Sequence, residues 1–399
     1  MNPLVKLAFI AGAGAVAAGC GAQAQTAALP AGTQTNAIRP RTAGYTVLHS
    51  FGIGSNDARV PEASLLRVGK LMYGTTDAGG PQNAGAVFTI TPSGDQTVIH
   101  SFGEKGDGVH CYAPLIDVNG ILYGTTSLGG ANNSGTVFSI APSGSEKVIY
   151  SFGATGDGKY PFAGLLEVDG TLYGTTTQGG EHGVGTVFSL TSSGAEKVLH
   201  SFGAVGDGAR PKAALIDVKG LLYGTTSVGG DRDSGVVYAI TTSGQESVIH
   251  RFGAKNDGSQ PVTGLINVKG TLYGTTVNGG AYDKGTVFAI RGFGIESVLH
   301  SFAGRDDGSY PEGGLLNFKG TLYGTTIYDG GLGGCLSHRC GTIFSLTTSG
   351  DETILHSFAG PPKDGAYPEG ALINFKGTLY GTTANGGYYD YGTVFAIAP

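Results

Sequence analysis

Leu122-Tyr123-Gly124-Thr125-Thr126, followed by Gly129-Gly130 and then Gly135-Thr136-Val137-Phe138, is a succession of short motifs that the chain repeats seven times. The spacing of the motif tyrosine is 50 residues at five steps and 57 at the last, as the positions show: Tyr73, Tyr123, Tyr173, Tyr223, Tyr273, Tyr323 and Tyr380. A fixed period of this size is typical of repeat arrays and propellers. The sequence therefore predicts one repeat domain built from copies of a single unit.

Composition narrows the classes of partner. Of the 399 residues, 14% are charged and 40% are hydrophobic, and the net charge is -6. Lysine and arginine are scattered singly and form no basic stripe. We therefore do not expect the protein to bind nucleic acid.

The N-terminus predicts export. Residues 1–20 carry one early cation, Lys6, then a short apolar run that ends at Ala17-Ala18-Gly19-Cys20. This is typical of a signal peptide, and the ending resembles a bacterial lipobox, which would make Cys20 the lipidated first residue of the mature chain. The alternative is simple secretion after a cut near Ala22-Gln23-Ala24. Residues 21–44 lack an apolar period and predict a flexible tether to the repeat domain at 45–399.

Each repeat predicts four short antiparallel strands. In the second repeat the apolar runs at 115–118 and 121–124 flank Asn119-Gly120, a pair that favours a type I′ hairpin. The first repeat has Gly69-Lys70 there, which suits the II′ alternative. Further strands are expected at 136–140 and 148–152.

The expected strands have adjacent apolar residues, such as Val137 and Phe138, so both faces of each small sheet must be covered. Identical sheets packed around an axis cover one another, which predicts an all-β, seven-bladed β-propeller. The array starts with a lone fourth strand around Val47 and stops with a third strand around Phe395. Pairing of these two strands is expected to complete the last blade and close the ring.

The motifs LYGTT, GG, GTVF, SG and V-[IL]-H-S-F, followed by GDG and P, resemble the choice-of-anchor tandem repeat known as GloVer over residues 45–399. That resemblance implies an exported propeller-like protein, and it implies no established activity or catalytic residues. The double glycine is also similar to kelch repeats, although the chain has no tryptophan.

The long loops are expected to gather on one face, where binding belongs. Each inter-blade loop carries an aspartate four residues before the position that begins the next blade: Asp57, Asp107, Asp157, Asp207, Asp257, Asp307 and Asp364. Their strict recurrence favours a turn in which the carboxylate accepts backbone N–H groups. The alternative is a ring of carboxylates that binds Ca²⁺ or sugar hydroxyls.

A histidine recurs in the fourth strand of six copies, with Tyr150 in the remaining copy: His49, His100, His200, His250, His300 and His356. Because blades hold these side chains far apart around the rim, we interpret them as strand residues with a repeated hydrogen bond rather than as metal ligands.

Aromatic and carboxylate side chains on the long-loop face are the candidate ligand-binding residues, since aromatic platforms beside hydrogen-bonding groups suit carbohydrate or peptide recognition. They are Tyr282, Asp283, Tyr388, Tyr389, Asp390, Tyr160, Tyr310 and Tyr367. Unconstrained loop variation would produce the same pattern.

The sixth repeat has a longer loop that contains Cys335 and Cys340. In an oxidising compartment a local disulfide between them is the first expectation. Cys335, His338 and Cys340 with a fourth ligand from elsewhere form the metal-binding alternative. Cys111 stands where other copies have proline and is left unpaired as a buried thiol.

The sequence favours a lipid-anchored binding scaffold of the cell envelope. We expect a monomer whose partner is a cell-surface carbohydrate or protein. No cofactor is expected beyond the Ca²⁺ mentioned above. The membrane is contacted only through the lipid. The rivals are an extracellular polysaccharide lyase or hydrolase and a purely structural envelope protein. An enzyme would need one asymmetric cluster of carboxylates or histidines near the axis, and we expect diversity to be confined to the loops.

Overall fold

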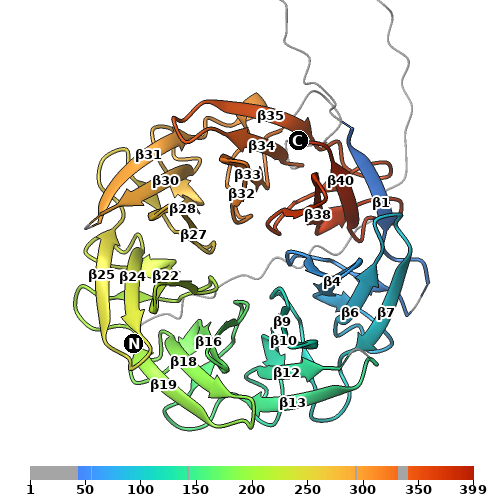
Figure 1. Ribbon diagram of the computed structural model, residues 1–399, viewed down its shortest axis with the longest axis horizontal. Coiled ribbons are helices and arrows are strands. Elements are labelled where there is room, and N and C mark those ends of the chain that lie inside the picture. Colours follow the sequence, from blue (N-terminus) through green and yellow to red (C-terminus); the bar gives the residue numbers. More distant parts are fainter. Residues whose placement is uncertain (1–43, 55, 142, 293, 331–339) are drawn as a thin grey trace, which may run out of the picture. The chain divides into compact units, whose positions relative to one another are not determined.

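Seven four-stranded antiparallel sheets stand around one axis in the computed structural model, which describes residues 44–399 without 55, 142, 293 and 331–339 (Figure 1). This is the predicted all-β seven-bladed propeller. The one helical element in the described residues is a 3₁₀ turn, η1 (Arg305–Asp307). No helix among them is long and apolar enough to span a bilayer.

Each blade runs from an inner strand near the axis to an outer strand at the rim. Blades 1 to 3 are β3 (Leu66–Val68), β4 (Leu71–Thr76), β6 (Ala86–Ile90), β7 (Gln96–Ser101); β9 (Ile116–Val118), β10 (Ile121–Thr126), β12 (Thr136–Ile140), β13 (Glu146–Ser151); and β15 (Leu166–Val168), β16 (Thr171–Thr176), β18 (Thr186–Thr191), β19 (Glu196–Ser201). Blades 4 to 6 are β21 (Ile216–Val218), β22 (Leu221–Thr226), β24 (Val236–Thr241), β25 (Glu246–Arg251); β27 (Ile266–Val268), β28 (Thr271–Thr276), β30 (Thr286–Arg291), β31 (Ile295–Ser301); and β32 (Leu316–Phe318), β33 (Thr321–Thr326), β34 (Thr342–Leu346), β35 (Glu352–Ser357).

Blade 7 is assembled from both ends of the propeller. Its inner strands β37 (Ile373–Phe375), β38 (Thr378–Thr383) and β40 (Thr393–Ile397) are completed at the rim by β1 (Thr46–Ser50). Val47 is paired with Phe395, and the Phe51 N–H donates to the Gly392 carbonyl at 3.0 Å. The predicted closure of the ring is therefore confirmed.

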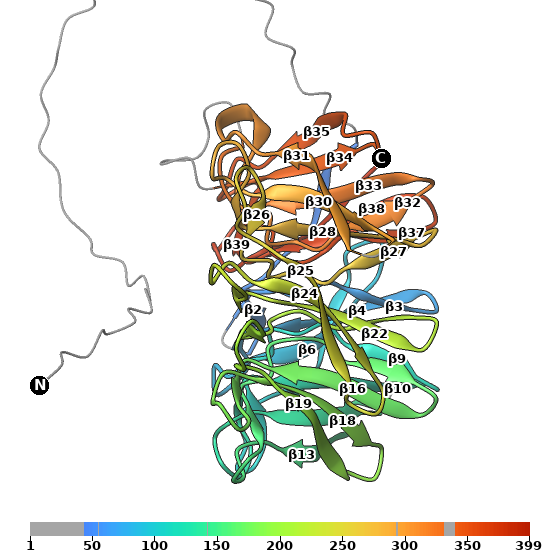
Figure 2. The same cartoon turned by 90° about the vertical axis from the view of Figure 1, so that its left-hand side faces the viewer.

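The two faces of the ring differ as expected. Six two-stranded ribbons, which the sequence did not predict, tie the long loops together on one face, where β2, β26 and β39 lie in Figure 2. They pair β2 (Ala58–Arg59) with β5 (Ala78–Gly79), β8 (Gly108–Val109) with β11 (Leu128–Gly129), β14 (Gly158–Lys159) with β17 (Gln178–Gly179), β20 (Gly208–Ala209) with β23 (Val228–Gly229), β26 (Gly258–Ser259) with β29 (Asn278–Gly279), and β36 (Gly365–Ala366) with β39 (Asn385–Gly386). The other face carries the tight hairpins between the two inner strands of each blade.

The hairpin turns have the predicted geometry. Asn119 and Gly120 both have positive φ, 54° and 85°, as a type I′ turn requires. In blade 1 Gly69 has φ 63° while Lys70 is not in the positive region, which fits the II′ alternative.

The hydrophobic core lies between the blades. The residue directly after the fourth strand of each blade is a phenylalanine that packs against an aromatic ring on the third strand of the next blade, as in Phe152 and Phe188, whose ring centroids are 5.0 Å apart. Both rings are fully buried. Each sheet is therefore covered by its neighbours, which is the physical reason that the apolar residues occupy both faces.

The two threonines of the LYGTT motif make hydrogen bonds between blades and within each blade. The first hydroxyl reaches the next blade, since Thr125 Oγ1 donates to the Ala163 carbonyl at 2.9 Å. The second stays within its own blade, where Thr126 and Thr136 hydroxyls are 2.8 Å apart. These contacts fix where the chain enters the following blade.

One core ring carries a polar atom that its six equivalents lack. Tyr238 is fully buried, and its hydroxyl has no hydrogen-bond partner among the described residues, whereas the other blades have phenylalanine there. An unsatisfied buried hydroxyl costs about 1–3 kcal/mol. We expect Tyr238→Phe to raise the free energy of unfolding by about this amount, measured by urea denaturation of residues 45–399.

Phe188→Tyr is the matched control, because it introduces a hydroxyl at the equivalent position of blade 3 and is expected to lower the free energy of unfolding. A destabilised Tyr238→Phe protein would contradict the prediction, since it would mean that the hydroxyl is satisfied in solution.

Candidate functional site

A cavity of about 310 Å³ lies on the axis, where the seven blades begin. The chain approaches the inner strand of each blade through a proline, such as Pro61, which Cys111 replaces in blade 2. The residue that follows this position lines the cavity in every blade, and the seven residues are Glu62, Tyr112, Phe162, Lys212, Val262, Glu312 and Glu369. The backbone places all of them alike, whereas their side chains differ from blade to blade. The symmetric ring therefore presents an asymmetric site.

The chain enters each blade through a residue with a left-handed backbone. Tyr160 has φ 57°, and its six equivalents have φ between 55° and 61°. Such a conformation is unfavourable for residues other than glycine and is held here by hydrogen bonds. The Tyr160 N–H donates to the Ser134 carbonyl at 2.9 Å, and its carbonyl accepts from Thr177 N–H at 3.1 Å. This fixed turn precedes Pro161 and Phe162, and the second of these lines the axial cavity.

Three glutamates from consecutive blades form the acidic side of the cavity. Burial raises the pKa of Glu62 and Glu369 well above the usual range, and their mutual repulsion and that of Glu312 and Asp77 raise it further. Burial also raises the pKa of Glu312, while Lys212 opposes this effect from across the cavity. These shifts favour the protonated form of Glu62 and Glu369, and a protonated carboxyl group both donates and accepts hydrogen bonds.

The other side of the cavity is aromatic. Tyr112 and Phe162 have ring centroids 5.1 Å apart, and the His110 ring stacks at 6.3 Å from Tyr112. His110 Nδ1 lies 2.6 Å from Asp77 Oδ1, a contact that raises the pKa of His110. An aromatic platform thus shares the cavity with a set of carboxyl groups.

Among the described residues, no His, Cys, Asp or Glu trio with ligand atoms within 4.8 Å occurs in this cavity. Its chemistry is that of aromatic stacking, hydrogen bonding and proton exchange.

The raised pKa values predict that stability depends on pH. A carboxyl group whose pKa is higher in the folded ring than in the unfolded chain favours folding in its protonated form, so its contribution is complete below the ordinary pKa and is lost as pH rises through the folded pKa. The free energy of unfolding is expected to fall between weakly acidic and alkaline pH, by about 1.4 kcal/mol for each tenfold difference between the folded and unfolded acidity constants. Urea midpoints across this range measure it.

Four glutamates at the rim also lower the free energy of unfolding as pH rises, because burial raises their pKa to about 7. They are Glu146, Glu196, Glu296 and Glu352. The informative quantity is therefore the difference between the parent protein and Glu369→Gln, which is expected to be less sensitive to pH. Identical pH profiles of the two proteins would show that the axial carboxyl groups do not titrate as described.

Three of the predicted ligand-binding tyrosines stand at the blade entrances, immediately before the proline. Tyr310 and Tyr367 each contact Tyr328, with ring centroids 5.6 and 5.5 Å apart, so they form one aromatic row. Tyr160 lies at the equivalent position of blade 3, and no ring contact joins it to that row within the described part of the chain.

The remaining predicted residues lie in the loops between the second and third strands. Asp283 Oδ1 accepts the Gly279 N–H at 3.0 Å and Asp390 Oδ1 accepts the Gly386 N–H at 2.8 Å, so both carboxylates close local turns. Tyr282 is 61% exposed and Tyr388 is 71% exposed. Tyr388 packs edge-on against Tyr389 at 4.9 Å.

The seven aspartates of the inter-blade loops accept backbone hydrogen bonds. Asp157 is representative, because its carboxylate accepts from Gly153 N–H at 2.9 Å and from Gly158 N–H at 2.6 Å. The histidine of the preceding strand also reaches this carboxylate in other copies, as His200 Nε2 does at 3.0 Å from Asp207. Equivalent backbone contacts are made by Asp57, Asp107, Asp207, Asp257, Asp307 and Asp364.

Two predicted cysteine sites lie outside the described residues. Cys20 and Cys335 fall there, together with His338, so lipidation, the disulfide with Cys340 and the metal alternative stay predictions. Cys340 itself is 3% exposed. Cys111 is a free, fully buried thiol whose Sγ lies 3.2 Å from the Thr125 carbonyl, and burial raises its pKa to about 12.

The axial residues were not predicted from the sequence. We expected the amino-acid type to vary between copies only in the loops. At the position of Glu62, however, the seven copies have five different residue types. The repeats do contain a signal of this variation. Pro61 before this position and Leu65 three residues after it recur almost unchanged, so the varied position stands out between them. Without the fold, however, nothing in the sequence shows that these seven side chains meet.

Comparison with known proteins gives a family and a fold. The sequence profile of the Gloeobacter/Verrucomicrobia repeat matches residues 31–187 and 165–395. No curated protein matches the chain.

Solved structures that resemble the chain include candidate 6-phosphogluconolactonases of Bacteroides uniformis and Bacteroides fragilis. The first is 11% identical with a TM-score of 0.51, and the match covers 80% of this chain and 88% of that one. The second is 16% identical with a TM-score of 0.50 at the same coverage. A puromycin-hydrolyzing peptidase of Mycobacterium tuberculosis is 12% identical with a TM-score of 0.50, over 84% of this chain and 52% of that one, so the chain spans about half of that protein. At such identities the likeness shows the fold alone.

Proposed function

This chain belongs to the Gloeobacter/Verrucomicrobia repeat family, and on that premise we propose that it is an exported propeller that binds a carbohydrate in its axial cavity. The observation that carries the proposal is the asymmetric ring of axial side chains, in which the Tyr112 and Phe162 rings line the same cavity as the carboxyl groups of Glu62, Glu312 and Glu369. Sugar rings stack on aromatic faces, and their hydroxyls exchange hydrogen bonds with carboxyl groups.

The size of the cavity supports a small ligand or the end of a chain. Its volume of about 310 Å³ is at the lower limit of ordinary ligand sites, which suits one or two sugar units. Lys212 adds a positive charge to the lining of the cavity, so an acidic sugar has a place in the same site.

A glycan array probed with residues 45–399 tests the proposal. We expect binding that Phe162→Ala weakens at least tenfold, because the stacking surface is lost. Tyr388→Ala is the matched control, since it removes an equally aromatic side chain that is 71% exposed in a loop. Loss of binding in Tyr388→Ala alone would move the site to the loops, and silence of the parent protein on glycans would favour a protein partner or a structural role.

Attachment to the membrane through Cys20 is part of the proposal and rests on the Ala17-Ala18-Gly19-Cys20 sequence. Globomycin, which blocks the lipoprotein signal peptidase, is expected to make the precursor accumulate. Cys20→Ala should release the protein from the membrane fraction. Processing that globomycin does not alter would support simple secretion.

A polysaccharide-acting enzyme is the second candidate, because the cavity contains the asymmetric carboxylate cluster that such an enzyme requires. Glu62, Glu312 and Glu369 have raised pKa values, and a carboxyl group that stays protonated near neutral pH can act as a general acid. Turnover of any glycan that binds should then be lost in Glu369→Gln while binding remains. Binding without turnover in the parent protein would leave the scaffold as the function.

A further inference from the structure

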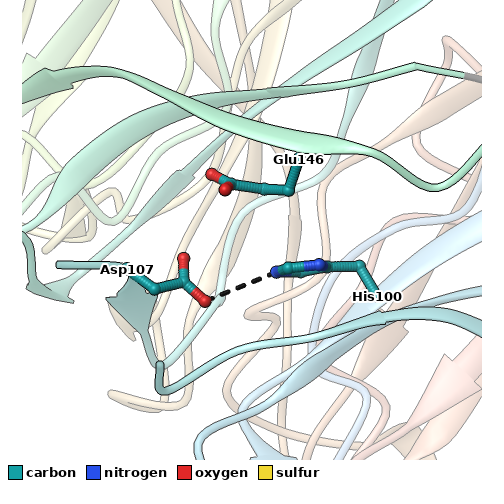
Figure 3. A group of neighbouring side chains, drawn as sticks. All are labelled: His100, Asp107 and Glu146. Atoms are coloured by element: carbon teal, nitrogen blue, oxygen red, sulfur yellow. Dashed lines mark ion pairs between the residues drawn. The ribbon is translucent and has the colours of Figure 1, made fainter. Parts of the chain in front are cut away.

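At the rim, the end of each outer strand lies beside the start of the next one around the ring (Figure 1). Between blades 1 and 2 this brings together His100 near the end of β7, Asp107 in the inter-blade loop and Glu146 at the start of β13. The approach is close, because a Cβ atom on Gly144 would stand 2.7 Å from the Ile99 carbonyl oxygen. Figure 3 shows the imidazole and both carboxylates converging on one another.

The three groups offer a nitrogen and two oxygen atoms that all lie within 4.8 Å of one another. Asp107 is held in place by the N–H groups of Gly103 and Gly108, at 3.2 and 2.6 Å. Its side chain is 7% exposed and that of His100 is 18% exposed. The cluster is therefore preorganised and shielded from most of the solvent.

Two of these atoms have no hydrogen-bond partner among the described residues. They are His100 Nε2 and Glu146 Oε1, and both are inaccessible to water. The His100 Nε2 to Asp107 Oδ2 distance is 3.4 Å, longer than an ordinary N–H···O hydrogen bond. Two ligands bound tetrahedrally to one zinc ion at about 2.0–2.1 Å stand about 3.3 Å apart, which is close to this separation.

We propose that His100, Asp107 and Glu146 bind one divalent transition-metal ion, such as Zn²⁺, that links two neighbouring blades. One imidazole and two carboxylates are a donor set that suits such ions, and a water molecule would supply the fourth ligand of a four-coordinate ion. The same three groups converge within 4.8 Å at two further interfaces, formed by His200, Asp207 and Glu246 and by His250, Asp257 and Glu296. The described part of the chain thus has three such clusters. In the two further ones the histidine Nε2 lies within hydrogen-bond distance of the aspartate, at 3.0 Å for His200 and Asp207 and at 3.2 Å for His250 and Asp257, so an ion would replace that hydrogen bond.

The sequence led us to expect histidines too far apart to bind metal. The structure instead makes three of the six histidines, His100, His200 and His250, meet the aspartate of the same blade connection and the glutamate of the next blade, so convergence occurs inside these three interfaces.

Two interfaces of the same chain provide natural comparisons. Between blades 2 and 3, Tyr150 stands in place of the histidine, and its hydroxyl reaches Asp157 at 3.0 Å and Glu196 at 3.5 Å. Between blades 7 and 1, Gln96 stands in place of the glutamate. The fold therefore accepts both His→Tyr and Glu→Gln at these positions, and neither substituted set is among the three that converge.

Zn²⁺ and Co²⁺ titrations of residues 45–399 without an affinity tag, after treatment with chelator, test the proposal. We expect three high-affinity ions per chain, a loss of one ion in His100→Tyr and a loss of all three in the triple variant Glu146→Gln, Glu246→Gln and Glu296→Gln. Bound Co²⁺ should show the intense visible bands of a four-coordinate ion. Glu196→Gln, at the tyrosine-containing interface, is the matched control and should leave the stoichiometry unchanged.

Equal stoichiometry in the parent protein and the triple variant would overturn the proposal, as would the absence of Zn²⁺ and Co²⁺ binding by the parent. Urea unfolding in metal-free buffer shows whether the variants fold, so a loss of ions cannot be mistaken for a loss of structure. The rim sites share no residue with the axial cavity, and this result is therefore independent of glycan binding.

Discussion

A chain that starts at residue 52, and so lacks β1, is expected to lose the folded monomer. Blade 7 then ends at β40, whose outer edge is paired with β1 in the intact ring. Phe51, which is fully buried against Phe88 at 5.0 Å, is lost as well. Removal of one buried phenylalanine side chain alone costs about 3–5 kcal/mol, and a whole domain is stable by only about 5–15 kcal/mol.

The open edge has a second consequence, because unpaired strand edges bind other chains. We expect size-exclusion chromatography to show aggregates, and thermal unfolding to lose its cooperative transition. A chain that starts at residue 44 is the matched control, since it keeps every described residue of the ring and should unfold as the full chain does. A cooperative monomer from the shorter chain would show that the seam is dispensable.

The largest effect of single substitutions is expected at Gly174 and Phe188 in blade 3. A Cβ atom on Gly174 would stand 2.5 Å from Phe188 Cζ and 3.0 Å from Leu165 Cδ2. Any larger residue at this position would therefore clash with the phenylalanine ring. Gly174→Ala should therefore cost about 1–3 kcal/mol through overpacking. Phe188→Ala should cost about 3–5 kcal/mol through the cavity that it leaves.

The double variant distinguishes this explanation from a general loss of strand stability. Removal of the ring relieves the clash, so the two costs should fail to add by about 0.5–3 kcal/mol in urea denaturation. Gly264→Ala is the matched control, because the atom nearest to an added Cβ is the Ala214 carbonyl oxygen at 3.6 Å. Strictly additive costs for Gly174→Ala and Phe188→Ala would contradict the proposed contact.

The sequence by itself determined the ring. A period of 50 residues, hairpin turns such as Asn119-Gly120 and strands that are apolar on both faces leave few arrangements other than a closed set of blades. Closure through Val47 and Phe395 followed from the incomplete repeats at the two ends of the array, and the pairing confirms it. These features are local or periodic, and periodic patterns can be read without coordinates.

The sites depended on tertiary structure, because their members are distant in the sequence and meet only once the ring has closed. Glu62 and Glu369 belong to opposite ends of the repeat array, yet both line the axial cavity. At the rim, His100 and Glu146 lie in different repeats and converge because consecutive outer strands follow one another around the circumference. The repeated sequence specifies the structure of each blade. The contacts between blades decide which side chains line the axial cavity and which converge at the rim.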